Sequence, residues 1–445
     1  MSRRRRRWLV GVLAGFALVP VVLSVRAGAA AVQNSDFTVL YTAATLVRHG
    51  QLAAVYDQAK MGPALLQVSD GHIDPTLPFD YPLADALPLV PLTLLPLQAA
   101  FRVWQLLILL LLAAAVFILN RLHPLGPAAV PFGLLAVLAA EPTWALLTEG
   151  QLGGVLLVGA VAVLAAADRD VAGWGFLGGV LLAFKPQYLP AYLVLLWAGR
   201  CRRALVAVIA GGLLVGCSAL LAGGPSGIAA MVRGMLAGSA WADLRSMDSW
   251  AGLLALGLPP RLAMIAGLGL FGATLIVLPV LARIHRVELA SRARIRPIRA
   301  SSPARVRSRT DGCAPSRARR LLRLGTPRIP ICGARSVDPG LARRRTDLLP
   351  FAGLAGCLAL LGSPHTLPHD MVLLLVPAWA AFVLHRQGRL RSPVAGLVIL
   401  QVGWVVDLHG LPVSAGALAL TGVLGWYLID FKRRAAARPR LYEAA

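Results

Sequence analysis

The sequence predicts an all-α, polytopic integral membrane protein with about twelve transmembrane helices. Three observations indicate this class. Hydrophobic residues make up 57% of the 445 residues, and the mean hydropathy is +0.70, which is too apolar for an ordinary soluble domain. Apolar stretches recur along the chain between short polar loops. The basic residues gather in some of those loops, as they do on the cytoplasmic side of membrane proteins.

The apolar stretches are the expected membrane spans. Several are shorter than the roughly 20 residues that a straight helix needs to cross the hydrocarbon core. Near Lys185-Pro186 we expect broken helices that meet at a polar break inside the protein. The expected spans lie near residues 8–27, 99–119, 127–147, 153–168, 172–184, 188–198, 204–222, 262–283, 348–362, 371–385, 393–407 and 412–430.

The distribution of Lys and Arg predicts the orientation. With the Arg3–Arg7 run in the cytoplasm, the other basic loops fall on the same side, and both termini are cytoplasmic. The first span also has the pattern of a signal peptide, but its length favours an uncleaved anchor. The loops expected outside are poor in Lys and Arg: 28–82, 148–152, 185–187, 223–250, 363–370 and 408–411.

Three regions are expected along the chain. Residues 1–285 form an N-terminal membrane region that includes the outer loop 28–82, and residues 346–445 form a C-terminal membrane region. Between them, residues 286–345 contain seventeen arginines and neither lysine nor an aromatic residue. This composition fits a disordered cytoplasmic loop, and it equally fits GC-rich DNA translated in a shifted frame.

Composition also excludes several classes of function. The formal charge of +24 comes from the short loops and the Arg-rich segment, and no nucleic-acid-binding motif accompanies it. The five cysteines are scattered, without the spacing of a disulfide framework or a zinc site. No phosphate-binding loop or dinucleotide fingerprint is present. We therefore expect neither a metal nor a cofactor.

The outer loop 28–82 contains the first candidate for chemistry. Phe37, Leu40, Tyr41 and Ala44 recur at helical spacing and predict a helix lying along the membrane surface. Asp36 stands at its start. A carboxylate just outside the membrane can accept a proton from a sugar hydroxyl. The alternative is that Asp36 only caps the helix.

Two further polar groups interrupt apolar sequence. His365, His369 and Asp370 form a compact cluster in which the imidazoles are suited to holding a phosphate or donating a proton. Alternatively, this is an interfacial turn with Asp370 capping the next helix. Lys185 lies between two apolar runs, where a lysine is costly and suggests a phosphate contact. The alternative is that its ammonium reaches the interface by snorkelling.

Tyr81 and Gln151 complete the set, as candidates for contacts with a sugar. All these groups fall on the predicted outer face, which favours an enzyme acting on a lipid-borne substrate. A transporter or flippase of lipid-linked envelope intermediates is the alternative, but it would keep its polar residues near the bilayer midplane and often show internal repeats. A non-catalytic scaffold would tolerate loss of Asp36.

The order of these motifs resembles glycosyltransferase family 87, the polyprenyl-phosphate-mannose-dependent α-mannosyltransferases of actinobacterial type, which have the GT-C fold. The resemblance covers most of the chain outside 286–345. It rests on Asp36-Phe37 with Tyr41 and Ala43-Ala44, Gly50, Tyr56-Asp57, Tyr81-Pro82, Gly150-Gln151, Lys185-Pro186-Gln187 and Ser363-Pro364-His365.

The resemblance implies an inverting hexosyltransferase in the cell membrane, with its active site on the extracytoplasmic face. Mannose would pass from a polyprenyl-phosphate donor to a glycolipid or polysaccharide. Asp36 matches the general base of the family, and His365 matches a histidine near the donor phosphate, with His369 a second possibility. Lys185 would lie in the phosphate region.

Overall fold

The computed structural model describes residues 28–79, 81–169, 171–236, 249–295, 348–363 and 366–392, with single positions within 11–26, 244–247 and 396–433. Every regular element in these ranges is a helix, which confirms the predicted all-α class. Half or more of each of the expected spans 8–27, 393–407 and 412–430 lies outside the described residues, as does most of the Arg-rich segment 286–345.

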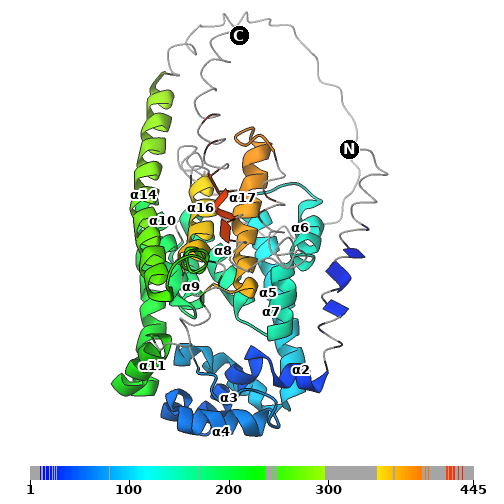
Figure 1. Cartoon of the computed structure of the whole chain (residues 1–445). Coiled ribbons are helices and arrows are strands. Elements are labelled where there is room, and N and C mark those ends of the chain that lie inside the picture. The colour runs from blue at the N-terminus through cyan, green and yellow to red at the C-terminus, as the bar shows by residue number, and fades with distance from the viewer. Residues whose placement is uncertain are drawn as a thin grey trace, which may run out of the picture.

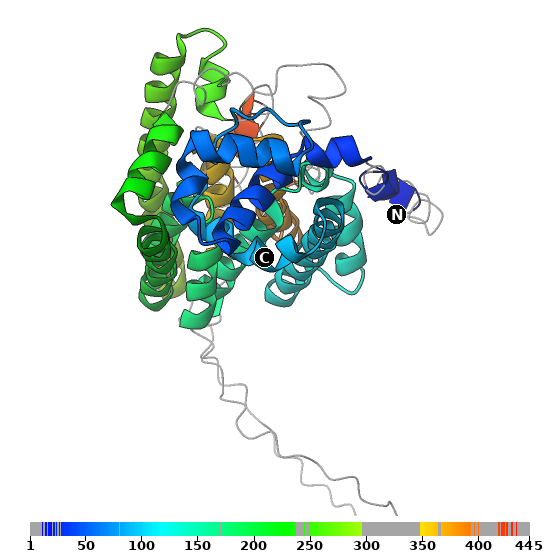
Figure 2. The same cartoon turned by 90° about the horizontal axis from the view of Figure 1, so that it is seen from below.

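The helices form a small layer across one end of a larger bundle (Figures 1 and 2). The layer contains α2 (Ala29–Gln33), α3 (Asp36–Arg48), η1 (Leu52–Tyr56) and α4 (Gln58–Val68). The 3₁₀ helices η2 (Leu83–Asp85) and η3 (Leu87–Leu94) follow it. The bundle contains α5 (Leu97–Leu122), α6 (Ala129–Leu138), α7 (Glu141–Glu149), α8 (Gly153–Arg169), α9 (Ala172–Leu182), η4 (Pro186–Tyr188), α10 (Leu189–Gly199), α11 (Arg202–Leu236), α13 (Trp250–Leu254), α14 (Pro260–Ile295), α16 (Leu349–Gly362), η7 (Pro368–Leu374) and α17 (Leu375–Arg386).

The helix predicted in the outer loop is present as α3, but it is buried within the protein instead of exposing one face, and its position relative to the membrane surface stays a prediction. Every residue from Phe37 to Ala44 is buried, and α3 packs against α4, η3 and α5. The physical reason is that this stretch has no charged face, so the helix is apolar or small on every side and belongs in a core. The hydroxyls of Thr38 and Thr42 bond to backbone carbonyls, which makes their burial tolerable.

Helix α8 forms the centre of the bundle. Its residues from Gly153 to Ala167 are all buried, and it contacts α5, α9 and η7. On its other side, α9 packs against α11, and glycines of α9 let the two helix backbones approach closely. A Cβ at Gly179 would lie 2.1 Å from the carbonyl oxygen of Val208, and one at Gly175 would lie 2.8 Å from that of Ala204. Small residues four apart are a common means of packing helices inside membranes.

Several helices have the length and exposed apolar surface of membrane spans. Among the described residues, four are long and apolar enough, namely Leu97–Leu122, Arg202–Leu221, Pro260–Val280 and Pro368–Arg386. The pair α6 and α7, bent by 62°, makes a fifth if it is one broken span. Exposed leucines on α5, α11 and α14 are consistent with contact to lipid. The larger number of crossings, about twelve, stays a prediction.

The break predicted near Lys185 is present. Helix α9 ends at Leu182, and α10 begins at Leu189 after the short η4 turn. The N-terminal and C-terminal membrane regions share one hydrophobic core, in which α16 packs on α10 and α14 while η7 packs on α7 and α8. The C-terminal helices therefore help to build the same bundle.

A left-handed turn at Gly150 ends α7 and directs the chain into the next loop. Gly150 has φ +65°, and its carbonyl oxygen accepts a hydrogen bond from Trp104 Nε1 at 2.7 Å. A Cβ here would lie 2.7 Å from the Cβ of Phe37 and 2.8 Å from the ring of Phe101. Glycine is thus required both by the backbone conformation and by the approach of α3.

We predict that Gly150→Ala destabilises the protein through both effects, costing about 1–2 kcal/mol for the left-handed backbone and a further ~1–3 kcal/mol for overpacking. The matched control is Gly50→Ala, because Gly50 also has a positive φ, +74°, but open space around its Cβ. Thermal unfolding of the two variants in detergent compares them. Equal losses would show that the contact with Phe37 and Phe101 is unimportant.

Candidate functional site

Asp36 is the first residue of α3, the helix of the layer that packs against η3 and α5. The N-cap position belongs to Ser35, so Asp36 is a first-turn residue and the capping alternative does not describe it. Its Oδ2 accepts a hydrogen bond from Nε2 of Gln151. Asp36 is half-buried. The partner in this hydrogen bond is a neutral amide, so the bond does not neutralise the negative charge of the carboxylate.

Gln151 joins Asp36 to Tyr81. The Tyr81 hydroxyl lies 2.8 Å from Gln151 Nε2 and 3.2 Å from its Oε1, and Gln151 is 1% exposed. Burial raises the pKa of Tyr81 well above its usual value, and the negative charge of Asp36 raises it further. Tyr81 therefore stays protonated at neutral pH, as a neutral hydrogen-bonding group. The three predicted residues form one hydrogen-bonded cluster drawn from three separate segments.

Lys185 and Asp370 form a buried ion pair. Lys185 Nζ donates to both carboxylate oxygens of Asp370, at 2.8 and 3.0 Å, and the two residues are 4% and 0% exposed. The snorkelling alternative for Lys185 is thus wrong, because its ammonium is held inside the protein. Asp370 Oδ2 also accepts the backbone N–H of Leu367 at 3.3 Å, so the predicted capping role is present alongside the pair.

His369 lies against the same ammonium. Its Nε2 is 3.3 Å from Lys185 Nζ and 3.7 Å from Asp370 Oδ1, and the ring is buried. An ammonium can only donate, so the contact with Lys185 is a hydrogen bond when Nε2 carries no proton. The geometry fits a neutral imidazole with its proton on Nδ1.

The two clusters adjoin each other through Tyr81 and the start of α8. The negative charges of Asp36, Asp370 and Asp85 all act to raise the pKa of Tyr81, so Tyr81 lies near acids of both clusters. A Cβ at Gly153, two residues after Gln151, would lie 2.8 Å from the carbonyl oxygen of His369. The structure thus brings together six of the seven predicted site residues. The seventh, His365, lies outside the described residues.

Two acidic residues that the sequence analysis missed also lie here. The carboxylate of Glu149 accepts a hydrogen bond from the backbone amide of Asp36 and repels the Asp36 charge. Asp85, in η2, is 1% exposed, and neither of its oxygens has a hydrogen-bond partner among the residues that the structure describes. The available signal for Asp85 was its position as a lone acid within the apolar stretch from Pro82 to Pro96.

Other features nearby have local roles. Tyr56 donates its hydroxyl to the Tyr81 carbonyl oxygen at 2.9 Å, which fixes the loop that leads to Tyr81. Asp57 caps α4 through the backbone N–H of Ala59 and pairs loosely with the exposed Lys60 at 3.6 Å. No cluster of three His, Cys, Asp or Glu side chains suited to a metal occurs in the described ranges.

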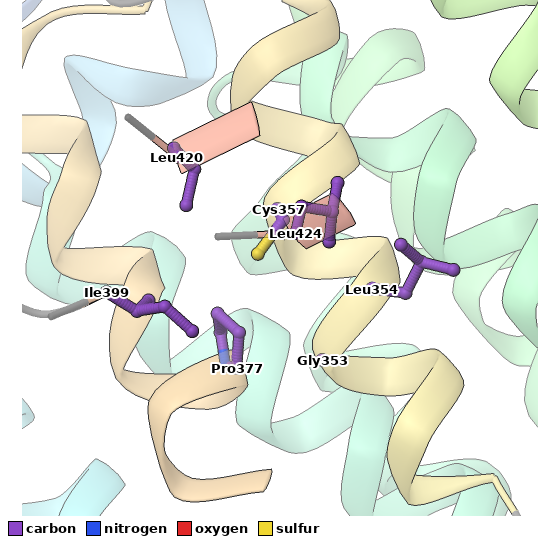
Figure 3. A pocket seen from close by; sticks show the side chains of 7 residues that line it. All are labelled: Gly353, Leu354, Cys357, Pro377, Ile399, Leu420 and Leu424. Atoms are coloured by element: carbon purple, nitrogen blue, oxygen red, sulfur yellow. The ribbon is translucent and has the colours of Figure 1, made fainter. Parts of the chain in front are cut away.

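A small apolar cavity lies away from these polar residues, between α16, α17 and the single described positions near the C-terminus (Figure 3). Its lining contains no charged or amide side chain, so it offers nothing to recognise a sugar or a phosphate. The lining residues are Gly353, Leu354, Cys357, Pro377, Ile399, Leu420 and Leu424.

The arrangement combines a carboxylate able to take a proton with a buried cation in the adjoining cluster. Asp36 is oriented by Gln151 at the edge of the layer, and Lys185 is fixed by Asp370 in the bundle. A base and a separate cationic site suit a displacement in which an acceptor loses a proton while an anionic group leaves.

We predict that Asp370→Asn costs about 3–5 kcal/mol of stability, because it leaves the Lys185 ammonium buried without a counter-charge. Thermal unfolding in detergent measures the loss. The control Asp57→Asn removes a partly exposed pair with Lys60 and should change stability by about 0–1 kcal/mol. Replacing both partners, Lys185→Met with Asp370→Leu, should restore most of the loss. A single change no worse than the control would refute this account of the pair.

Comparison with known proteins places the chain in a family. The model of glycosyltransferase family 87 matches residues 79–308, a segment that includes Tyr81, Gln151 and Lys185. Asp36 and Asp370 lie outside the matched segment, but each is hydrogen-bonded to a residue within it. Searches of curated proteins and of solved structures returned no match. Because the matched segment covers more than half of the 445 residues, the chain belongs to glycosyltransferase family 87.

Proposed function

We propose that this glycosyltransferase moves mannose from a polyprenyl-phosphate donor to a hydroxyl of a glycolipid or polysaccharide at the extracytoplasmic face, with inversion at the anomeric carbon and on a GT-C fold. The observation that carries the proposal is that a half-buried carboxylate, Asp36, held by Gln151, and a buried cation, Lys185, held by Asp370, belong to two clusters that both adjoin Tyr81. Membership of the family and the apolar spanning helices support a sugar donor held in a bilayer.

Asp36 is the proposed general base. It takes the proton of the acceptor hydroxyl as that oxygen forms a bond to the anomeric carbon. The amide of Gln151 holds Oδ2, and Tyr81 holds the amide in turn, so the carboxylate is fixed before the substrate arrives. A fixed base avoids the cost of reorganisation during the reaction.

Lys185, His369 and Asp370 form the proposed site for the donor phosphate, and His365 is the further candidate there. As the glycosidic C–O bond breaks, its electron pair passes to the phosphate oxygen and negative charge accumulates there. A cation in a low-dielectric site stabilises this charge far more effectively than the same cation in water. Asp370 holds the ammonium of Lys185 in position.

We predict that Asp36→Asn lowers sugar transfer by about a hundredfold or more, the range expected when a general base is lost. The measurement is transfer of radiolabelled mannose from polyprenyl-phosphate-mannose in membranes that express each variant. Asp57→Asn, in the same layer, serves as the matched control and should retain full activity. Equal transfer by the wild type and Asp36→Asn would remove Asp36 from the role of base.

We predict that the layer faces the outside of the cell. In a variant with its cysteines replaced by serine, a cysteine at exposed Lys60 should react with a membrane-impermeant maleimide in intact cells. A cysteine at exposed Gln387, beyond the end of α17, should react only after the cells are opened, because the positive-inside rule assigns that loop to the cytoplasm. The reverse pattern of labelling would contradict the proposed orientation.

A further inference from the structure

Asp85 is the buried acid that the proposed mechanism does not use. Its side chain is 1% exposed, and within the described part of the chain neither oxygen meets a hydrogen-bond donor. Leaving a buried polar group unpaired is unfavourable whether the carboxyl is charged or neutral. An unpaired buried carboxyl therefore calls for an explanation, and a ligand that supplies the missing hydrogen bonds is one.

The neighbouring donors are already committed. The Tyr56 hydroxyl donates to a backbone carbonyl, and the Tyr81 hydroxyl lies against Gln151. The ammonium of Lys185 is shared between Asp370 and His369. Among the residues that the structure describes, the polar groups near Asp85 therefore donate none of their hydrogens to it. Hydroxyl groups of a substrate would supply the hydrogen bonds that these residues do not.

The position of Asp85 indicates which substrate would supply those hydroxyls. The positive charge of Lys185 acts to lower the pKa of the Asp85 carboxyl, so the two side chains lie near each other. The charge of Asp85 in turn acts to raise the pKa of the Tyr56 and Tyr81 hydroxyls. Glu149, by contrast, is the acid that adjoins Asp36. Asp85 is thus on the side of the phosphate-binding cation. The sugar attached to that phosphate is the part of the donor that would lie beside it.

We propose that Asp85 binds hydroxyl groups of the donor sugar through hydrogen bonds to its two carboxyl oxygens. This inference rests on the proposed function, because it assumes that the donor phosphate binds at Lys185. A carboxyl group offers two oxygens to neighbouring hydroxyls of one sugar ring, so Asp85 would help to select the donor sugar. Its role is substrate binding, and the proton of the reaction stays with Asp36.

The principal variant is Asp85→Leu, which removes both oxygens while keeping a side chain of similar size. We expect the KM for polyprenyl-phosphate-mannose to rise about ten- to hundredfold, as befits the loss of one or two hydrogen bonds, while kcat changes less than about threefold. The KM for an acceptor probe, octyl α-mannoside, should be unchanged. A rise confined to the acceptor KM would overturn the assignment to the donor.

Thermal unfolding separates this role from a structural one. Because the carboxyl of Asp85 has no hydrogen-bond partner to lose among the residues that the structure describes, Asp85→Leu should leave the unfolding temperature unchanged or raise it. Thr93→Val, in the neighbouring η3, is the matched control, since Thr93 is also buried but bonds to the Val90 carbonyl oxygen. The control should lower stability and leave the donor KM unchanged. A lower unfolding temperature in Asp85→Leu, with an unaltered donor KM, would make Asp85 structural.

Donors that lack single hydroxyls provide a second test, and its first part uses the wild type alone. In the wild type, the deoxy-mannose donor missing the contacted hydroxyl should lose about tenfold or more in kcat/KM, whereas in Asp85→Leu the same omission should cost little. Equal use of every deoxy donor by the wild type would overturn the inference alone. A wild type that neither transfers from nor is stabilised by polyprenyl-phosphate-mannose would overturn the proposed function and this inference together.

Discussion

The buried ammonium of Lys185 is the constraint around which the rest of the site is arranged. An isolated charge in so apolar an interior would be prohibitively unfavourable, and it is tolerated because Asp370 faces it with both oxygens. The two residues are 185 positions apart, one in the turn between α9 and α10 and the other in η7. The C-terminal helices must therefore dock for the break in the bundle to be stable. This coupling makes the last part of the chain essential to a site that lies mostly in the first.

Gln151 makes the second coupling, between the layer and the bundle. Its amide meets Asp36 from α3 and Tyr81 from the loop before η2. The turn that presents it exists because Gly150 adopts a left-handed conformation and lets α3 approach. The position of Gln151 and the environment of the Asp36 carboxylate thus depend on each other. The glycine sets the path of the backbone, and that path gives the Asp36 carboxylate its partner.

Local patterns in the sequence were enough to predict the helical class, the break near Lys185 and the helix that begins at Asp36. They were also enough to identify Tyr81, Gln151, Lys185, His369 and Asp370 as polar groups out of place in apolar sequence. The partners of these residues were beyond prediction, because each contact joins segments far apart in the chain, such as Asp36 with Gln151. Asp85 is a lone acid in apolar sequence, but only the folded structure reveals that its carboxyl has no hydrogen-bond partner among the described residues.

The burial of α3 shows where pattern and packing diverge. Helical spacing of Phe37 and Leu40 predicted an amphipathic helix on a membrane, whereas small residues and threonines on the other faces allow burial on all sides. Burying α3 brings its first residue, Asp36, against the bundle instead of leaving it at a water-exposed edge. The burial of α3, which the sequence pattern did not predict, is therefore the feature that creates the site.

The balance of charge suits the proposed anionic donor. Asp85 and Asp370 act on the buried Lys185, and Asp36 and Glu149 lie in the adjoining cluster, so these four acids would repel a phosphate if all were ionised. Burial raises the pKa of Asp85 well above its usual range, with the charge of Lys185 acting in the opposite direction, so Asp85 tends towards its neutral form. The pair of Lys185 and Asp370 is neutral as a unit. A site of low net charge would bind the phosphodiester of the proposed donor only weakly in the ground state. The ammonium of Lys185 would then stabilise the negative charge that develops as the phosphate leaves, which favours the transition state over the bound substrate.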